Sequence, residues 1–194
     1  MNDMRSALFA AMMLTALPLQ AGGMIRAEGS VEVAFAPWDD AERLVMDQID
    51  GAKQAIYVQA YALTSRNIAR TLIAARERGL KVEIIADRDK VLKDEHSALP
   101  RVAGSGAALW LDGHYTAAHS KVMIVDPDGK DPVVVTGSYD FSTNGKPDNA
   151  ENVLVLSGNR ALAKSYMDNW QRHRAQSVSF ADAIDQMNKD AARP

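Results

Sequence analysis

The chain has 194 residues, of which 47% are hydrophobic and 24% charged, a composition typical of one globular domain with a substantial core. Its formal net charge of −3 excludes a broadly basic nucleic-acid binder, so a site for a polyanion must be a local cluster of cations. The absence of cysteine excludes disulfides, thiolate metal sites, thiol nucleophiles and lipid attachment through an N-terminal cysteine.

The first 21 residues have the pattern of a secretory signal peptide. Arg5 supplies a positive charge, residues 7–17 are almost entirely apolar, and Pro18 ends this run shortly before small residues that suit a cleavage site. The run is too short for a membrane-spanning helix, which needs about 20 residues. We therefore expect residues 1–21 to be removed and the mature protein to be periplasmic or secreted, without stable membrane insertion. A true start at Met24 is the alternative.

Hydrophobic patterns in the first half of the chain predict strands that alternate with helices. Strands are expected at 31–36, 55–63 and 80–86. A helix capped by Asp39 or Asp40 and a helix capped by Thr64 or Ser65 separate them and run to about 52 and 78. This order favours crossover connections and a sheet covered by helices. Residues 90–103 are polar and predict a helix or a loop.

The second half predicts short strands followed by one long helix. Strands are expected at 107–111, 118–125, 133–136 and 152–156, and a helix with one apolar face at 160–175. The residues from about Asp185 are polar and are expected to fray. The predicted organisation is a catalytic domain at 30–177 and a C-terminal tail at 178–194.

The strand expected at 118–125 carries a histidine and a lysine on one face. Alternate residues of a strand point the same way, so His119 and Lys121 share a face, and apolar residues on both faces favour a central strand. An imidazole can attack phosphorus to form a phospho-histidine, and a fixed cation can stabilise charge on the non-bridging oxygens. A carboxylate must orient the ring, and Glu151, after the loop that returns toward the site, is the best candidate.

A structural histidine beside a lysine that extends to solvent is the alternative explanation for an isolated His-x-Lys. Here Asp126 follows after four residues, and then come Gly137-Ser138 and Asn149-Ala150-Glu151-Asn152. This order is much rarer by chance and favours the catalytic interpretation.

These residues resemble the phospholipase D superfamily, whose mark is His-x-Lys-x4-Asp followed by Gly-Ser-x-x-Phe. Segments 61–65 and 149–152 are similar to those of its small, exported bacterial endonucleases, and the resemblance extends from about Phe35 to Trp170. It implies an α/β fold in one domain, a phospholipase D-like mixed β-sheet flanked by helices as an α-β-α sandwich. It also implies that the reaction needs no metal and no cofactor.

Because two such motifs make one active site and this chain has one, the resemblance implies a homodimer. His119 of one subunit would be the nucleophile, and His119 of the other would protonate the leaving oxygen and later activate water. Asp126 is implied to be more a structural partner than a chemical one. The predicted catalytic residues are His119, Lys121, Asp126, Ser138 and Glu151, and the predicted substrate-binding residues are Gly137, Asp140, Asn149 and Lys146.

Asp140 departs from the family, which usually has asparagine there. An asparagine donates a hydrogen bond to phosphate, whereas an ionised aspartate repels it. Asp140 is therefore protonated, paired with Lys121, or a cause of weaker phosphate binding. His96, His114 and His173 are interpreted as solvated or structural histidines.

Three functions remain open from the sequence. The favoured one is a metal-independent, non-specific endonuclease that hydrolyses DNA and RNA phosphodiester bonds. The second is a phospholipase D that converts phosphatidylcholine to phosphatidic acid and choline, although the sequence shows no amphipathic membrane helix. The third is a degenerate nucleic-acid-binding dimer, which Asp140 makes conceivable.

Overall fold

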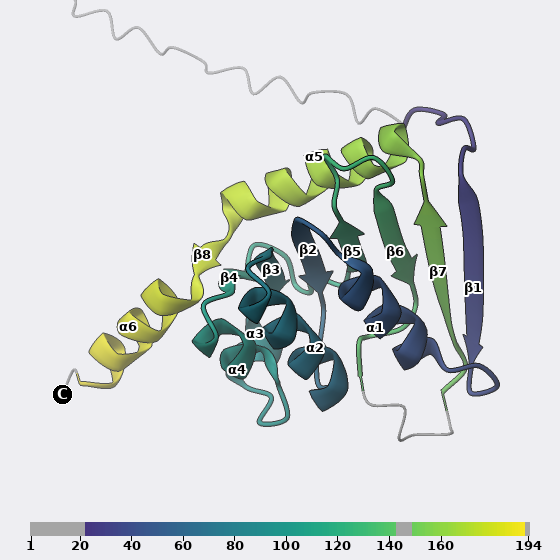
Figure 1. The fold of residues 1–194 in the computed structure, drawn as a ribbon. Helices are drawn as coiled ribbons and strands as arrows, with labels where there is room; N and C mark the ends of the chain where they lie inside the picture. Colours follow the sequence, from purple (N-terminus) through teal and green to yellow (C-terminus); the bar gives the residue numbers. More distant parts are fainter. Residues whose placement is uncertain (1–21, 143–148, 193–194) are drawn as a thin grey trace, which may run out of the picture.

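The structure is a computed structural model that describes residues 22–142 and 149–192. The predicted signal peptide and Lys146 lie outside these residues. The described chain forms one α/β domain around a mixed sheet (Figure 1). The strands are β1 (Ser30–Ala36), β2 (Ala55–Ala60), β3 (Lys81–Asp87), β4 (Ala108–Asp112), β5 (Lys121–Val125), β6 (Val133–Gly137), β7 (Glu151–Ser157) and β8 (Val178–Ser179). The helices are α1 (Ala41–Gly51), α2 (Arg66–Glu77), α3 (Arg88–Leu92), α4 (Leu99–Gly104), α5 (Arg160–Gln176) and α6 (Phe180–Ala191).

The order of the strands in the sheet is β1-β7-β6-β5-β2-β3-β4-β8. Strands β2, β3 and β4 run parallel, as the alternation of strands and helices predicted. The other neighbouring strands pair antiparallel, so β5 begins on the side of the sheet where β2, β3 and β4 have their carboxyl ends; this side is called the carboxyl edge below. This edge gathers the ends of strands that lie far apart in the sequence.

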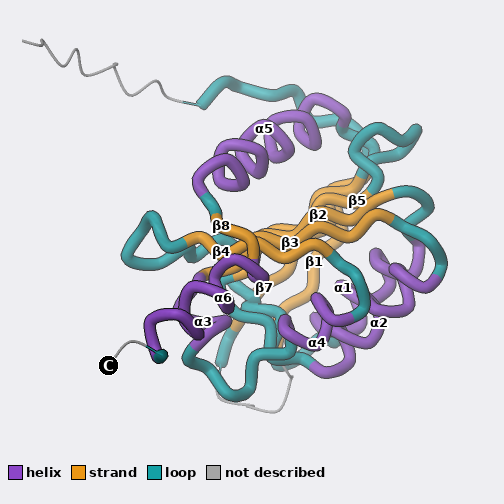
Figure 2. Tube along the Cα trace, turned by 90° about the vertical axis from the view of Figure 1, so that its left-hand side faces the viewer, coloured by secondary structure: helices purple, strands orange, loops and turns teal. Residues whose placement is uncertain are grey.

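Helices cover both faces of the sheet (Figure 2). Helix α5 lies on one face, where Trp170 packs with Ile85, Val122 and Ile124. Helices α1, α2 and α4 lie on the other face, over a larger core that includes Met123 and Val125. The alternating residues of β5 thus enter two separate cores, and the α-β-α sandwich implied by the resemblance is confirmed.

The helices begin where side chains can cap their first amides. Asp40 and Ser65 accept hydrogen bonds from the amides of Arg43 and Ile68, at 2.9 Å and 3.0 Å. Of the alternatives that the sequence left open, these are therefore the two caps. A cap of this kind contributes about 1 kcal/mol to the stability of its helix.

Three segments differ from the expectation. Residues 90–103 fall across two short helices, α3 and α4. Strand β5 starts at Lys121 rather than at 118, so His119 lies just outside the regular strand. The C-terminal tail contains β8, which pairs with β4, and helix α6, which includes Asp185 and continues to Ala191. Ser179 caps α6, and its hydroxyl accepts from the amide of Asp182 at 3.1 Å, while Phe180 and Ala183 pack against the larger core.

Candidate active site

The predicted motif lies at the sheet edge where β2 ends and β5 begins. Ala60 pairs with Lys121, and the amide of Tyr61 donates to the carbonyl of Ser120 at 2.9 Å. On the other side, Val122 pairs with Thr136 near the end of β6. Residues from β2, β5 and β6 therefore converge on one small region.

Lys121 and His119 form the centre of this region. The Lys121 Nζ lies 2.9 Å from Nδ1 and 3.1 Å from Nε2 of His119, and it donates to the His119 carbonyl at 3.2 Å. Since an ammonium only donates, the ring nitrogen that it contacts acts as an acceptor. Lys121 is 7% exposed, whereas His119 is exposed. A fixed cation thus lies beneath an accessible imidazole, as nucleophilic attack on a phosphate ester requires.

The ring of Tyr61 forms one wall beside this pair. Its centre lies 4.3 Å from the centre of the His119 ring, with the planes tilted by 49°. The ammonium nitrogens of Lys121 and Lys90 lie 4.9 Å and 5.1 Å from the same ring centre. The aromatic ring therefore contacts the imidazole and two cations at once, and restricts how His119 can turn.

Asp140 forms an ion pair with Lys121, with 3.0 Å between Oδ1 and Nζ. Of the three states considered for this residue, the structure favours the pair. The Asp140 side chain remains 34% exposed, so its carboxylate stands at the mouth of the site. A phosphate that binds Lys121 must share the ammonium with this carboxylate.

The Gly-Ser turn after β6 is held by the start of β7. A Cβ on Gly137 would lie 2.1 Å from the Asn152 carbonyl oxygen, so only glycine permits this approach. The Ser138 hydroxyl accepts from the amide of Asn152 at 3.0 Å, and the Ser138 amide donates to the Asn152 carbonyl at 3.1 Å. Ser138 is exposed, beside the residues that precede β5.

The residues after Ser138 anchor the turn in the core. Tyr139 and Phe141 are 4% and 2% exposed, and the Tyr139 hydroxyl donates to the Ser142 carbonyl. Burial raises the pKa of Tyr139 well above its usual value, and the charges of Glu42 and Asp40 raise it further. The Phe141 carbonyl accepts from the Ser65 amide at 3.1 Å, which ties the turn to the start of α2.

Asp126 does not join this cluster. It follows the last residue of β5, and Lys121 is the first, so about 17 Å of strand separates them. Its carboxylate accepts from the amides of Lys53, Gln54 and Ala55 at 2.7, 2.7 and 2.9 Å. Asp126 therefore makes structural contacts, as the resemblance implied: it fixes the start of β2 against the end of β5.

Glu151 and Asn149 approach the same edge from β7. Glu151 is the first residue of β7 and is half-buried, and Asn149 is exposed in the preceding segment. Among the hydrogen bonds and ion pairs between described residues, none links Glu151 to His119. The orienting contact predicted for Glu151 is thus not made in this conformation of the single chain.

Sequence reasoning missed Asp87, which positions the loop before His119. Asp87 is 5% exposed, and its carboxylate accepts from the amides of Lys90 at 3.0 Å and Ala118 at 2.9 Å. The available signal was its place at the carboxyl end of a parallel strand, where such folds gather functional groups.

The other histidines stand apart from this cluster. His96 and His114 are exposed. His173 lies 2.7 Å from the buried carboxylate of Asp112, through Nδ1 and Oδ2, and so links α5 to the end of β4. Within residues 22–142 and 149–192, no group of three or more metal-binding side chains could hold an ion. No helix among these residues is long and apolar enough to cross a membrane.

Comparisons with known proteins agree with this geometry. The family described as "Cardiolipin synthase, PLD-like domain" matches residues 45–174. The chain is 36% identical over 145 residues to a phospholipase D of Rickettsia felis, which covers 75% of this chain and 70% of the relative. It is similar to the crystal structure of Nuc from Salmonella typhimurium, a phospholipase D family member, with a TM-score of 0.70 and 32% identity over 78% of this chain and 97% of that one.

A more distant relative is the mitochondrial cardiolipin hydrolase of Xenopus laevis, 25% identical over 134 residues, which are 69% of this chain and 61% of the relative. The fold and the His-Lys site together define a phosphodiesterase. The chain belongs to the phospholipase D superfamily.

Proposed function

We propose that this phosphodiesterase is a non-specific endonuclease that hydrolyses DNA and RNA without a metal ion. In the first step, a ring nitrogen of His119 attacks phosphorus, and the bond from phosphorus to the leaving ester oxygen breaks. The bonding electrons go to that oxygen, which takes a proton from a general acid. In the second step, water attacks the phospho-histidine, loses a proton to the same group and releases His119.

Lys121 and Ser138 are the groups proposed to hold the phosphate. The Lys121 ammonium is buried beneath the exposed imidazole, so it is available to the non-bridging oxygens of an ester attacked by His119. The Ser138 hydroxyl accepts from Asn152 and keeps its own hydrogen free to donate to a phosphate oxygen.

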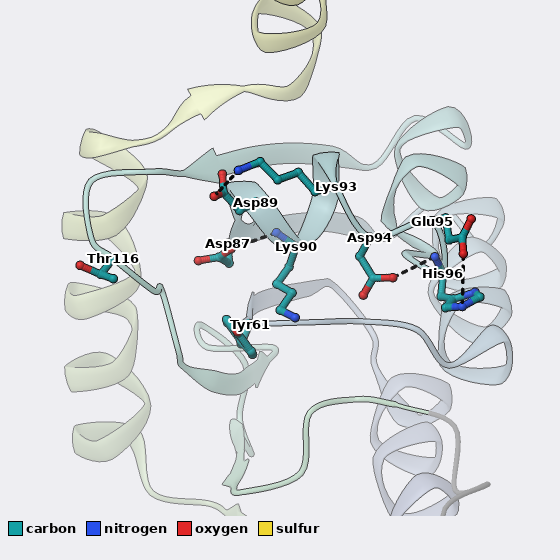
Figure 3. A pocket seen from close by; sticks show the side chains of 9 residues that line it. All are labelled: Tyr61, Asp87, Asp89, Lys90, Lys93, Asp94, Glu95, His96 and Thr116. Atoms are coloured by element: carbon teal, nitrogen blue, oxygen red, sulfur yellow. Dashed lines mark hydrogen bonds and ion pairs between the residues drawn. The ribbon is translucent and has the colours of Figure 1, made fainter.

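The observation that carries the choice of nucleic acid is the lining of a cavity that is next to the His119 site, because Tyr61 lines the cavity and also contacts His119 (Figure 3). This open cavity has a volume of about 630 Å³. Among the described residues that line it there is one aromatic ring and no aliphatic side chain. The lining residues are Tyr61, Asp87, Asp89, Lys90, Lys93, Asp94, Glu95, His96 and Thr116. Acyl chains need apolar walls, whereas a sugar-phosphate strand suits a polar cavity with one half-buried tyrosine ring.

A homodimer is proposed because the reaction needs a second acid–base group. Among the other described histidines, His96 lines the cavity beside Glu95, and His114 and His173 do not line it, so a second His119 is proposed as the matching group. The outer face of β1 supports this assembly, since Val31, Val33 and Phe35 are 65%, 45% and 50% exposed. They pair with Leu156, Leu154 and Asn152 of β7. Helix α5 covers β3 to β6 and leaves this apolar face open, and its Asn152 end contacts Ser138.

A phospholipase D activity is the second candidate, and one structural observation favours it. Trp38, in the turn after β1, is 82% exposed next to the same apolar face, and exposed tryptophans suit a lipid interface. The similarity to proteins named phospholipase D and cardiolipin hydrolase points the same way. In this alternative, the β1 face would contact a membrane instead of a second subunit.

Purified mature protein incubated with plasmid DNA, RNA and phosphatidylcholine vesicles, each with and without EDTA, tests the proposal. We expect cleavage of both nucleic acids that survives EDTA and is lost in His119→Ala. Loss of cleavage in EDTA would refute the metal-free mechanism, and choline release without DNA cleavage would establish the second candidate. No activity on any substrate would leave the degenerate nucleic-acid-binding dimer.

Assembly is tested with Val33→Glu, which places a charge on the β1 face. We expect it to convert the dimer to a monomer in sedimentation velocity and to lower activity in parallel. Val178→Glu is the matched control, because Val178 is 51% exposed on β8 at the opposite edge of the sheet. A fully active monomer would contradict the shared site.

For export, we propose a periplasmic or secreted protein, which cell fractionation with and without residues 1–21 would test.

A further inference from the structure

Lys90 is a cation beside the active site that the motif does not include. It lies in α3, is half-buried, and its ammonium points toward Tyr61 (Figure 3). Among the described residues, no carboxylate forms an ion pair with it, and its one close contact is the Tyr61 ring at 5.1 Å. Lys93, on the same wall of the cavity, is instead neutralised by Asp89 at 2.8 Å.

Lys90 and Lys121 share the Tyr61 ring. Each ammonium lies about 5 Å from the centre of that ring, so the two nitrogens are at most about 10 Å apart. In each strand of a nucleic acid one phosphate follows another every 3.4 Å of helix axis or so. If Lys121 holds the scissile phosphate, Lys90 is therefore within reach of a neighbouring phosphate on the same strand.

The carboxylates around Lys90 leave room for only one such phosphate. Asp89 is paired with Arg88 and Lys93, and the Asp87 carboxylate accepts from two backbone amides; among the described residues neither forms an ion pair with Lys90, so its ammonium is available to a phosphate. Asp94 and Glu95 line the far side of the cavity, where they repel a further phosphate. A strand that enters at His119 would then leave the cavity after Lys90.

We propose that Lys90 and the Tyr61 ring form a subsite for the phosphate next to the scissile one. The subsite makes the enzyme selective for substrates with more than one phosphodiester, and the strand of a nucleic acid is the substrate that fits it. Tyr61 lines the cavity between the two cations, where it can contact the intervening sugar or base. This inference rests on the proposed nuclease function, and it assigns to Lys90 the preference for a polymeric substrate over a single diester.

The test compares two substrates in wild type and Lys90→Gln: a long oligothymidylate, and bis(4-nitrophenyl) phosphate, which has one diester. On the oligonucleotide we expect kcat/KM to fall about fivefold more than on the single diester, mainly through KM. The plot of log kcat/KM against log salt should lose a slope of about 0.7, one phosphate contact on a single strand. Lys81→Gln is the charge-matched control, because Lys81 also lies over a tyrosine ring, 5.2 Å from the centre of Tyr57, but is paired with Glu83 at the start of β3, far from His119.

Equal losses on the two substrates, or an unchanged salt slope in Lys90→Gln, would overturn the subsite. An equal change in Lys81→Gln would also overturn it, because the effect would then come from net charge alone. A binding assay separates the Lys90 subsite from the proposed nuclease function. It compares the affinity of the oligonucleotide for His119→Ala with its affinity for the double variant that also carries Lys90→Gln. A Kd that rises about fivefold supports the subsite even if the cleavage mechanism fails. A wild type that hydrolyses the single diester but does not bind the oligonucleotide refutes both.

Discussion

Replacing Asp140 with asparagine should increase the affinity of the site for phosphate. In the structure, the Asp140 carboxylate lies 3.0 Å from the Lys121 ammonium that is proposed to hold the substrate. Asparagine has nearly the same shape, carries no charge and can donate a hydrogen bond to a phosphate oxygen. Asp140→Asn therefore removes a repulsion and adds a contact without changing the size of the side chain.

The size of the effect follows from the geometry. A phosphate oxygen bound to Lys121 at hydrogen-bond distance would lie about 5 Å from the Asp140 carboxylate, and at an effective dielectric constant of about 20 two such charges repel by about 3 kcal/mol. Because the Asp140 side chain is 34% exposed, solvent screening lowers this to about 1–2 kcal/mol. Since 1.4 kcal/mol is tenfold, kcat/KM should rise roughly 5- to 30-fold.

The assay is steady-state cleavage of a labelled oligonucleotide at fixed salt, with KM and kcat determined separately. Asp128→Asn is the matched control: it changes the net charge equally but lies in the exposed turn after β5, at the other end of that strand, and should leave both constants unchanged. An unchanged or higher KM in Asp140→Asn would refute the repulsion argument. A fall in kcat alone would mean that Asp140 orients Lys121 and does not oppose the phosphate.

Substitutions at three further positions test the scaffold of the site. Asp126→Ala should lower the free energy of unfolding, measured by urea denaturation, by about 3 kcal/mol, because three backbone amides lose a charged acceptor and alanine is strained at a φ of +48°. Asp126→Asn should lower it by less, since asparagine tolerates this backbone conformation. Equal losses in the two variants would contradict that account. Gly137→Ala should destabilise by at least 2 kcal/mol and reduce cleavage, because its Cβ would overlap the Asn152 carbonyl oxygen, and a variant as stable and active as wild type would exclude this constraint. The pKa of Tyr139 is raised in the folded protein above its unfolded value of 10.0, so its contribution to stability is complete below that pH and is lost as the pH rises above it. Tyr139→Phe should therefore reduce the loss of stability at alkaline pH. Thermal melting measured between about pH 9 and 11.5 checks this.

Most of the elements could be predicted because their signals are local. Period-two and period-3.6 patterns identify the strands and the long helices, and their boundaries agree with the structure to within a few residues. His119 and Lys121 also lie within three consecutive residues, so their proximity could be predicted without knowing the fold. Helix α6 was not predicted, although Phe180, Ala183, Ile184 and Met187 recur at helical spacing; these side chains stay partly or fully exposed, and the helix starts at the Ser179 cap.

The contacts that build the site depended on strand order instead. Asp126 is five residues from Lys121 in sequence, yet it binds the amides at the start of β2, at the other end of strand β5. Residues in an extended strand are separated by about 3.3 Å each, so five residues span the sheet. Tyr61 and Lys90 are distant in sequence from His119, and the parallel run of β2, β3 and β4 brings them to it.

The amino-acid sequence alone determined the α/β class, the superfamily and the residues of the His-x-Lys motif. These properties reside in residue types and short spacings, which exist before the chain folds. Only the tertiary structure decided that Asp140 pairs with Lys121 and that Lys90 shares the Tyr61 ring with Lys121. Such contacts join side chains from different strands and loops, and their distances are set by sheet register and packing rather than by position in the chain.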